Sequence, residues 1–341
     1  MTNGEIVSSK GLRPPFIFAH QNGTTTEVSL GFAGAMAVAM VLEGLLGWPN
    51  SLVARIGHPV TWLGRLIDAL DARWNREKAA PSIRRAAGVA AALVVLGLAA
   101  GLGWLLQSLI SPWDRVVLPG ILAMPFIASR SLYEHVVAVA RPLEAGDIAS
   151  ARSAVAMIVG RDPARLDETG IARTALESLA ENASDGIVAP VFWGALFGLP
   201  GIIGYKAVNT LDSMIGHRTA RYEAFGWASA RIDDVANAVP ARLTGLLFAL
   251  ISARPGNAFA CMFRDARKHR SINAGWPEAA MAGGLAVRLC GPRFYDGELA
   301  DEPWLNEGAR DPNAADITEG LRLYIRAMAS ITALLVLLAF V

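Results

Sequence analysis

The sequence has little charge for its length. Asp, Glu, Lys and Arg make up 18% of its 341 residues, against about 25% in an ordinary globular domain. Hydrophobic residues make up 53%, and the mean hydropathy is +0.37. Sparse charge combined with long apolar runs indicates a bilayer environment rather than a large soluble core. The formal net charge of +1 gives no sign of a nucleic-acid partner, which would require a strongly basic face.

Cysteine is also scarce, and two familiar motif classes are missing. Cys261 and Cys290 belong to no CxxC motif and to no Cys/His cluster in the sequence. The sequence therefore predicts neither a disulfide framework nor metal–thiolate chemistry, and we interpret each thiol as a small buried hydrophobe. No G-x-x-x-x-G-K-[ST] motif occurs, which excludes a P-loop for ATP.

The apolar segments predict a multi-pass membrane protein. The clearest is Ala86–Ile110, which has 25 residues and no charge. At about 1.5 Å per residue it is long enough to cross a hydrocarbon core of about 30 Å. No convincing strand alternation is present, so we expect an all-α protein with three or four spans. Weaker or interrupted apolar segments are Leu30–Gly47, Val116–Ala128 (continuing past Arg130 as an amphipathic helix), Ile187–Tyr205, Leu243–Ile251 and Ala327–Val341.

The rest of the chain divides into an extension and one domain. Residues 1–28 lack the features of a signal peptide and are interpreted as a disordered extension. Residues 29–341 form a single membrane-embedded domain whose polar region, about 253–320, is expected outside the bilayer. Basic residues are dense at 55–85 and again at 264–270, and the positive-inside tendency places both on the cytoplasmic side. We therefore expect a cell inner-membrane protein whose active site faces the cytoplasm.

The first polar cluster is Glu177–Gly186. It ends a helix predicted from about Glu168 to Asn182, with Asp167 as N-cap and Asp185-Gly186 as the stop. Glu177 and Glu181 lie four residues apart on one helical face, where like charges destabilise a helix by a few tenths of a kcal/mol. A bound cation or an arginine would remove that penalty. The alternative is a solvated polar face.

The second cluster, Tyr205–Met214, directly follows an apolar segment. Lys206, Asn209 and Asp212 recur at three-residue spacing, which makes one stripe on a helix. Lysine and aspartate at a membrane boundary can simply extend to the interface and pair. Three aligned polar groups fit a phosphate–Mg²⁺ site better, because Mg²⁺ takes one or two carboxylates together with substrate phosphates.

Two further clusters and one histidine complete the candidates. Asp233 and Asn237 share a helical face in an acidic segment similar to the Mg²⁺–diphosphate sites of membrane prenyltransferases. The basic run Arg264–His269 predicts either a lipid-facing surface or a phosphate-binding site. His58 is isolated, and on its own it is interpreted as structural.

Together these clusters resemble the adenosylcobinamide-phosphate synthase family of cobalamin biosynthesis (CbiB/CobD type). The resemblance covers about residues 30–310. One departure is Gly47-Trp48-Pro49, because similar sequences often carry an acidic residue before that proline. The blocks that carry the resemblance are His58–Val60, Glu177–Gly186, Tyr205–Met214, Phe225–Asp234, Asn237–Leu243 and Asn273–Gly283.

The resemblance implies a ligase that depends on ATP and Mg²⁺. It would join a carboxylate of adenosylcobyric acid, the corrinoid substrate, to the amine of an aminopropanol phosphate. The Mg²⁺ ligands would come from Asp212, Asp233 and Glu177, with Asp234, Glu181 and Asp185 as further candidates. The expected catalytic residues are Asp212, Lys206, Asp233, Asp234 and Glu181. The expected substrate-binding residues are Asn182, Asp185, Asn209, Arg231, Asn237, Arg242, His58 and Lys268, of which Arg231 and Arg242, with Lys206, are expected to contact phosphate.

Two other function classes stay open at this point. A membrane prenyl- or phosphotransferase would explain the acidic helices, although more clean spans would be expected. A non-catalytic membrane sensor would leave the clustered Lys206, Asp212, Asp233 and Asp234 without a role. The expected partners are the two substrates, the lipid bilayer and other membrane enzymes of the cobalamin pathway. Because Glu177–Gly186 and Tyr205–Met214 flank an apolar segment rich in Gly and Pro, we predict a kinked or re-entrant hairpin whose polar ends converge.

Overall fold

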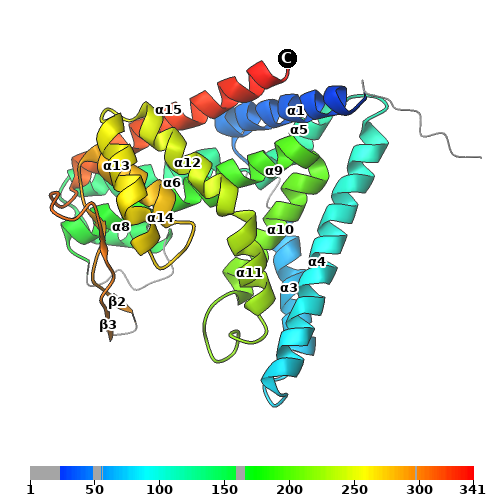
Figure 1. The fold of residues 1–341 in the computed structure, drawn as a ribbon, viewed down its shortest axis with the longest axis horizontal. Helices are drawn as coiled ribbons and strands as arrows, with labels where there is room; N and C mark the ends of the chain where they lie inside the picture. Colours follow the sequence, from blue (N-terminus) through cyan, green and yellow to red (C-terminus); the bar gives the residue numbers. More distant parts are fainter. Residues whose placement is uncertain (1–23, 49–54, 56, 159–165, 296–297) are drawn as a thin grey trace, which may run out of the picture.

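The structure, a computed structural model, describes residues 24–48, 55, 57–158, 166–295 and 298–341. Figure 1 shows helices over most of its length. The α-helices are α1 (Thr24–Leu46), α3 (Pro59–Trp74), α4 (Pro81–Ile110), α5 (Val117–Ala123), α6 (Ser129–Glu144), α7 (Ile148–Ala156), α8 (Glu168–Ala183), α9 (Ala189–Phe197), α10 (Leu199–Ile215), α11 (Trp227–Ala236), α12 (Ala238–Ile251), α13 (Pro255–Asp265), α14 (Gly275–Leu285) and α15 (Ala314–Leu338).

Short elements complete the fold. Two 3₁₀ turns, η1 (Met124–Phe126) and η3 (Ala266–Lys268), and a π-helical turn, η2 (Ser184–Val188), join the α-helices. The strands β1 (Leu289–Cys290) and β4 (Trp304–Leu305) pair antiparallel, as do β2 (Arg293–Tyr295) and β3 (Glu298–Ala300). The expectation of a mainly helical protein is confirmed. These strands were missed because two or three residues are too few to show an alternating pattern.

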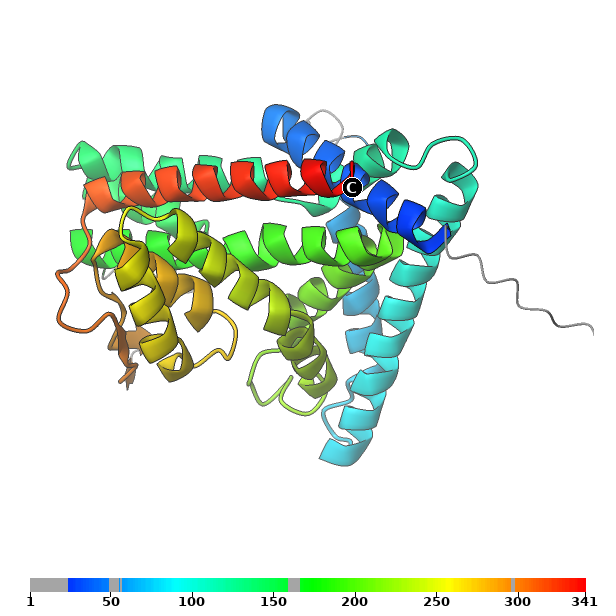
Figure 2. The same ribbon diagram turned by 45° about the horizontal axis from the view of Figure 1, so that its top comes forward.

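Two helices, α4 and α15, are long and apolar enough to cross a membrane, among the residues that the structure describes. A third span results if α11 and α12, which meet at a bend of 43°, count as one. Helix α15 starts at Ala314, well before the apolar tail at Ala327 that the sequence suggested. Figures 1 and 2 show α4 running along one end of the molecule, while α15 runs beside α6 and α8, with which it packs.

Helix α4 has one face of small residues and one of large apolar residues. Its buried face, which packs on α10 and α3, consists of Gly88, Ala91, Ala92, Val95, Ala99 and Gly103. A Cβ at Gly103 would lie 2.7 Å from the backbone of Pro200, so glycine permits the close approach. Exposed Leu93, Leu98 and Trp104 lie elsewhere on the helix. Small residues toward protein and large apolar ones outward are typical of membrane helices.

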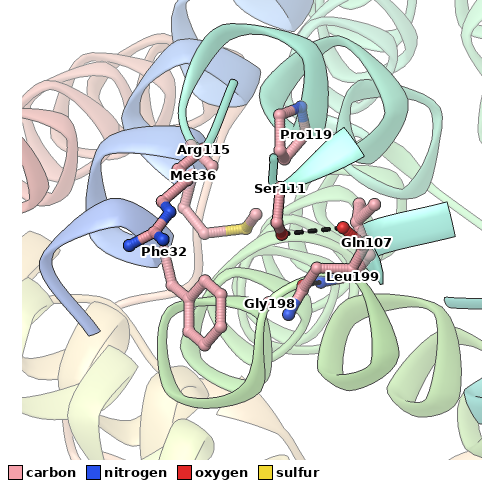
Figure 3. Close-up of a pocket in the computed structure, with 9 residues that line it drawn as sticks. Phe32, Met36, Gln107, Ser111, Arg115, Pro119, Gly198 and Leu199 are labelled. Carbon is pink, nitrogen blue, oxygen red and sulfur yellow. Dashed lines mark hydrogen bonds between the residues drawn. The ribbon is translucent and has the colours of Figure 1, made fainter. Parts of the chain in front are cut away.

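Helices α9 and α10 form a hairpin that breaks at Gly198. Its φ of +66° lies in the region that favours glycine. Figure 3 shows that α4 contacts this break, because the Gln107 side chain lies beside Gly198 and Leu199. Gln107 Oε1 accepts the backbone N–H of Leu199 at 2.8 Å, and Ser111 Oγ donates to the Gln107 carbonyl at 2.7 Å. A pocket of about 110 Å³ lies at this junction.

Replacing Gly198 with Ala should destabilise the fold by about 1–3 kcal/mol. The new Cβ would be strained at φ +66° and would overlap Gln107 Oε1. Thermal unfolding in detergent provides the measurement. Gly204→Ala is the matched control, since its Cβ would meet only the Ala100 Cβ at 3.9 Å. Equal melting temperatures for the two variants would show that the break does not depend on glycine.

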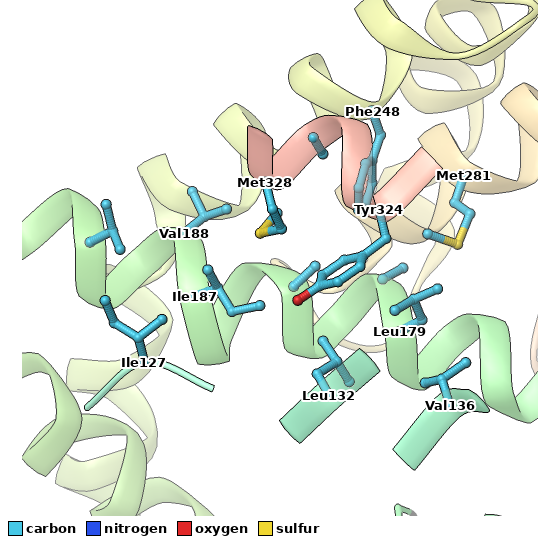
Figure 4. Close-up of a cluster of buried hydrophobic side chains, with 14 of the residues drawn as sticks. Ile127, Leu132, Val136, Leu179, Ile187, Val188, Phe248, Met281, Tyr324 and Met328 are labelled. Atoms are coloured by element: carbon cyan, nitrogen blue, oxygen red, sulfur yellow. The ribbon is translucent and has the colours of Figure 1, made fainter. Parts of the chain in front are cut away.

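A core of buried side chains fixes the helices that carry the polar clusters. In Figure 4, Tyr324 of α15 lies among residues of α6, α8, α12 and α14, including Leu132, Leu179, Phe248 and Met281. The Tyr324 hydroxyl donates to the carbonyl of Ser129 at 2.7 Å, which ties α15 to the first turn of α6. Helices α6 and α8 are therefore positioned by apolar packing on the side away from their polar residues.

Several expected boundaries differ from the structure. Helix α1 begins at Thr24, so residues 24–28 do not belong to an extension, and residues 1–23 lie outside the described part. The expected continuous helix past Arg130 is wrong, because Ile127 is extended between η1 and α6. Asp167 does cap α8, with its side chain accepting the N–H of Gly170. The predicted stop at Asp185-Gly186 is wrong, since the chain continues through the π turn η2 into α9.

Candidate functional site

The two main polar motifs meet in one cavity of about 680 Å³ between α6, α8, η2 and α10. The predicted convergence of the hairpin ends is therefore confirmed. The π turn carries Asp185 within this wall, and such turns are often found at functional sites. Helix α8 and η2 contribute Glu181, Asn182 and Asp185, and α10 contributes Lys206, Asn209 and Asp212. The other polar residues of the lining are Ser131, His135, Ser178, Ser213 and His217.

A chain of hydrogen bonds connects the walls of this cavity. The Tyr205 hydroxyl donates to Asn237 Oδ1 at 2.7 Å and lies 3.1 Å from the carbonyl oxygen of Asp185. Asn237 in turn donates from Nδ2 to Asp233 Oδ2 at 2.9 Å. Asn237 and Tyr205 are buried. The chain links η2, α10 and α11, so the acidic helix α11 is held against the other two motifs.

Burial is the main cause of the pKa shifts at the site, and neighbouring carboxylates add to it. Burial, and then the charges of Glu181 and Asp233, raise the pKa of Asp185 well above its ordinary value. Burial also raises the pKa of Asp212, with the carboxylate of Asp234 adding to that rise. Each rise means that the ionised form lacks full compensation in the folded protein. A bound cation would supply that compensation.

Lys206 is the cation at the centre of this cluster. It donates to Asn209 Oδ1 at 3.3 Å. Burial lowers the pKa of Lys206, while the charge of Asp185 opposes that change. A lysine held in this way presents a charge to a ligand with little solvent around it, which strengthens its interaction with a phosphate.

The donor set fits a divalent cation. Buried Asp233 Oδ1 has no hydrogen-bond partner among the described residues. The carboxylates of Glu181, Asp185 and Asp212 line one cavity. Mg²⁺ prefers such oxygen ligands, and usually takes one or two carboxylates together with waters and substrate phosphates.

A second cavity of about 700 Å³ adjoins the first and shares Lys206, Ser131 and His135 with it. His58 lines this second cavity, and its Nδ1 accepts the N–H of Val60 at 3.2 Å as N-cap of α3. Burial lowers the pKa of His58, and the nearby Lys206 charge adds to the effect. The structural role that the sequence suggested is confirmed, yet the ring also lies beside Lys206.

Seven candidate residues are absent from both cavity linings. Asp233, Asp234 and Asn237 belong to the α11 segment described above, and the other four make contacts elsewhere. Glu177 is buried and accepts the N–H of Cys290 at 2.7 Å. Arg231 pairs with Asp234 at 2.8 Å, and Lys268 pairs with Asp265 at 2.8 Å. The Arg242 guanidinium stacks on the ring of Trp276, 4.5 Å from its centroid. Their expected ligand and phosphate roles stay predictions that this geometry does not support.

Apart from His58 and Lys206, sequence reasoning missed the polar residues of the second cavity. Glu43, Arg130, Glu134 and His135 line it. Buried Glu43 accepts the backbone N–H of Arg130 at 3.0 Å and the hydroxyl of Ser129. A signal was available, since Glu43 is the one charge in the first apolar segment. The residues of α6 gave none, because an amphipathic helix with a charged face is usually solvated.

Comparison with known proteins identifies the family. The family model described as "CobD/Cbib protein" matches residues 36–324. A cobalamin biosynthesis protein CobD of Rhodobacter capsulatus is 60% identical over 311 residues, covering 91% of this chain and 98% of the relative. CobD proteins of a Sinorhizobium species and of Brucella anthropi are 46% and 45% identical, covering 86% and 88% of this chain and 93% and 95% of the relatives. No solved structure matches. The chain belongs to the CobD/CbiB family.

Proposed function

We propose that this protein acts in cobalamin biosynthesis as an ATP- and Mg²⁺-dependent ligase. It would join a side-chain carboxylate of adenosylcobyric acid to the amine of an aminopropanol phosphate, giving adenosylcobinamide phosphate. The relatives' name, cobalamin biosynthesis protein CobD, supports the pathway. The observation that carries the chemistry is the single cavity in which Lys206 and Asn209 lie with the carboxylates of Glu181, Asp185 and Asp212.

The chemistry of amide formation explains why such a cavity is needed. A carboxylate is a poor electrophile, so the γ-phosphoryl group of ATP first passes to it, giving an acyl phosphate and ADP. Lys206 would contact the transferring phosphoryl group, where a fixed positive charge stabilises the transition state. Asp212, Asp185 and Glu181 would hold Mg²⁺, which neutralises phosphate charge when bound. The amine then attacks the acyl carbon and phosphate leaves.

The leaving proton of the amine needs an acceptor within the site. Burial and the Lys206 charge lower the pKa of His58, which favours the neutral ring. Because its Nδ1 already accepts the Val60 N–H, Nε2 carries the ring proton, and a cavity carboxylate would take the proton of the amine instead. The ring lines the second cavity, which Lys206 shares with the first. The two joined cavities, about 680 and 700 Å³, would accommodate the nucleotide and the acceptor portion of the large corrinoid in adjoining spaces.

We further propose a multi-pass location in the cell inner membrane with the site open to the cytoplasm. Helices α4 and α15 are long and apolar enough to cross, and exposed leucines along α4 suit a lipid environment. Both substrates of the ligation carry phosphate or carboxylate groups, so they would reach the site from the cytoplasm. We also propose contact with other membrane enzymes of the cobalamin pathway.

The decisive experiment incubates purified protein with adenosylcobyric acid, aminopropanol phosphate, ATP and Mg²⁺. Mass spectrometry should detect adenosylcobinamide phosphate together with ADP and phosphate, and omission of ATP should abolish the product. A prenyl- or phosphotransferase would leave the corrinoid carboxylate free. A sensor would bind corrinoid without consuming ATP. Folded protein that yields no amide product would overturn the ligase proposal.

Replacing Lys206 with Met should raise the KM for the phosphate-bearing substrates about tenfold or more, because a charge-assisted contact contributes about 1.5–3 kcal/mol. Methionine keeps most of the volume of the side chain. Steady-state kinetics and the melting temperature are measured together. If the melting temperature collapses while KM per folded molecule is unchanged, Lys206 serves only as an ion-pair partner of the neighbouring carboxylates.

The shared site requires both motifs to be accessible from the same side of the membrane. Ser213 and Asn182 are exposed and both line the first cavity, so cysteines there should react with an impermeant maleimide added to inside-out vesicles. Ala183 is buried and would be a poor reporter. The native Cys261 and Cys290 are buried and should give little background. Labelling of the two positions from opposite sides would refute a single cytoplasmic site.

A further inference from the structure

A second group of chemically active side chains lies outside both cavities. His269, Glu278 and Cys290 each offer a donor atom, and all three atoms lie within 4.8 Å of one another. Cys290 Sγ is 3.1 Å from Glu278 Oε2, and His269 Nε2 is 3.7 Å from the same oxygen. Glu278 and Cys290 are 3% and 2% exposed. The proposed ligase chemistry uses none of these groups.

Three separate elements bring these donors together. His269 directly follows η3, Glu278 lies in the first turn of α14, and Cys290 ends β1 with φ +59°. Backbone contacts orient two of them. The Cys290 N–H donates to Glu177 Oε1 at 2.7 Å. His269 Nδ1 lies 3.0 Å from the backbone nitrogen of Ser271, whose N–H it can accept, and 3.2 Å from the Ser271 carbonyl oxygen. With a metal ion bound, Nδ1 would carry the ring proton and donate to that carbonyl, which leaves the lone pair of Nε2 for the ion.

We propose that His269, Glu278 and Cys290 bind one zinc-class divalent ion. A thiolate, an imidazole and a carboxylate are the protein ligands of zinc, at about 2.3, 2.0–2.1 and 2.0–2.2 Å from the ion. Tetrahedral placement at those lengths separates two donors by roughly 3.3–3.6 Å, close to the observed 3.1 and 3.7 Å. The thiolate selects against Mg²⁺, which prefers oxygen ligands.

This proposal departs from the sequence-based expectation that the chain holds no metal–thiolate site. Spacing motifs detect ligands that lie close in sequence, whereas here the ligands come from a 3₁₀ turn, a helix and a strand. The ion would cross-link these elements within the polar 253–320 region. Through Glu177, which accepts the Cys290 N–H, the same cross-link would steady α8, whose next turn carries Glu181. Water would take the fourth coordination position.

Cobalt substitution tests the site without any activity assay. Purified protein freed of metal by a chelator should bind one equivalent of Co²⁺ and develop the near-ultraviolet absorption of a thiolate–Co²⁺ bond. Cys290→Ser should lose that absorption, and His269→Gln should weaken Co²⁺ binding at least about tenfold, since lost ligand interactions of this kind cost 10–100-fold. Zn²⁺ should displace Co²⁺ and raise the melting temperature of the wild-type protein.

The second cysteine provides a matched control. Cys261 is equally buried, and burial raises the pKa of its thiol to about 12, so Cys261→Ser should keep the full Co²⁺ absorption. Equal absorption in Cys290→Ser would overturn the proposal. If Cys290→Ser does not fold, metal binding to the wild-type protein tests the proposal. Less than one tenth of an equivalent of bound Co²⁺ or Zn²⁺ would also overturn the proposal. Excess Mg²⁺ should not displace the Co²⁺, which separates this site from the cavity.

Discussion

Asp212→Asn should lower the rate of corrinoid amidation by about 10²–10³-fold while leaving the protein folded in the membrane. The carboxylate lines the first cavity beside Asn209 and Ser213. The amide keeps the shape of the side chain but removes the charge that would hold Mg²⁺. Because the raised pKa of Asp212 reflects burial and a neighbouring carboxylate, losing its charge should not destabilise the Mg²⁺-free protein. Product formation and thermal unfolding are measured on the same preparation.

Asp68→Asn is the matched control for this experiment. Asp68 is exposed on α3 and lies outside both cavity linings, so its variant should turn over at the wild-type rate. Titration with Mg²⁺ sharpens the comparison, since Asp212→Asn should also require more Mg²⁺ for half-maximal activity. Near-normal turnover of a well-folded Asp212→Asn protein would remove this residue from the metal site.

Asp185→Asn should make the Mg²⁺-free protein more stable at neutral pH and remove its stabilisation by Mg²⁺. Burial and the charges of Glu181 and Asp233 raise the pKa of Asp185 above its ordinary value of 3.8. The folded protein therefore binds this proton more tightly than the unfolded chain does. The stability from this group is fully present below the unfolded pKa and is lost as pH rises through the raised folded pKa.

Magnesium should reverse that loss, because a cation stabilises the ionised carboxylate. Its stabilising effect should be largest at neutral pH and should fade as pH drops through the raised pKa, since protons compete with the metal for the same oxygens. Melting temperatures with and without Mg²⁺ across pH provide the measurement, with about 1.5 °C expected per kcal/mol for a chain of this length. In Asp185→Asn, both the melting temperature and its increase with Mg²⁺ should depend less on pH.

Asp147 supplies a control of opposite sign. As N-cap of α7 its side chain accepts the N–H of Ser150 at 3.0 Å, and the hydrogen bonds from Ser150 lower the pKa of Asp147. Asp147→Asn should therefore not stabilise the Mg²⁺-free protein, and the Mg²⁺ effect should persist in it. If Asp147→Asn and Asp185→Asn behave alike, the gain arises from net charge rather than from the cavity.

The sequence predicted those elements whose structure is determined by residues close together in the chain. The uncharged run Ala86–Ile110 became α4, Asp167 became the N-cap of α8, and the Gly- and Pro-rich segment became a hairpin. It failed at Asp185-Gly186, because an acidic residue before glycine resembles a helix stop. Packing of Gly186 and its neighbours keeps the backbone helical there in a wider π turn. No local sequence pattern distinguishes such a π turn from a helix stop.

The candidate site was predictable only where its residues follow one another along a helix. Lys206, Asn209 and Asp212 share a stripe, and that stripe does line the cavity. Glu177 shares a helical face with Glu181 in principle, yet it turns into the interior toward Cys290. Which side of a helix meets a cavity depends on the packing of neighbouring helices. Nothing in the local sequence of α6 indicates which of its residues line the site.

Because η2 is a π turn, the rotation of α8 about its own axis relative to α9 depends on the number of residues in η2. In an α-helix each residue advances the side-chain direction by about 100°, and a π turn accommodates one residue beyond the α-helical repeat. Shortening Ser184–Val188 by one residue would let a regular α-helix run from α8 into α9. Glu181 and Asn182 would then point about 100° away from α10 if α9 kept its place. The number of residues in η2 therefore determines whether the polar side chains of α8 face those of α10.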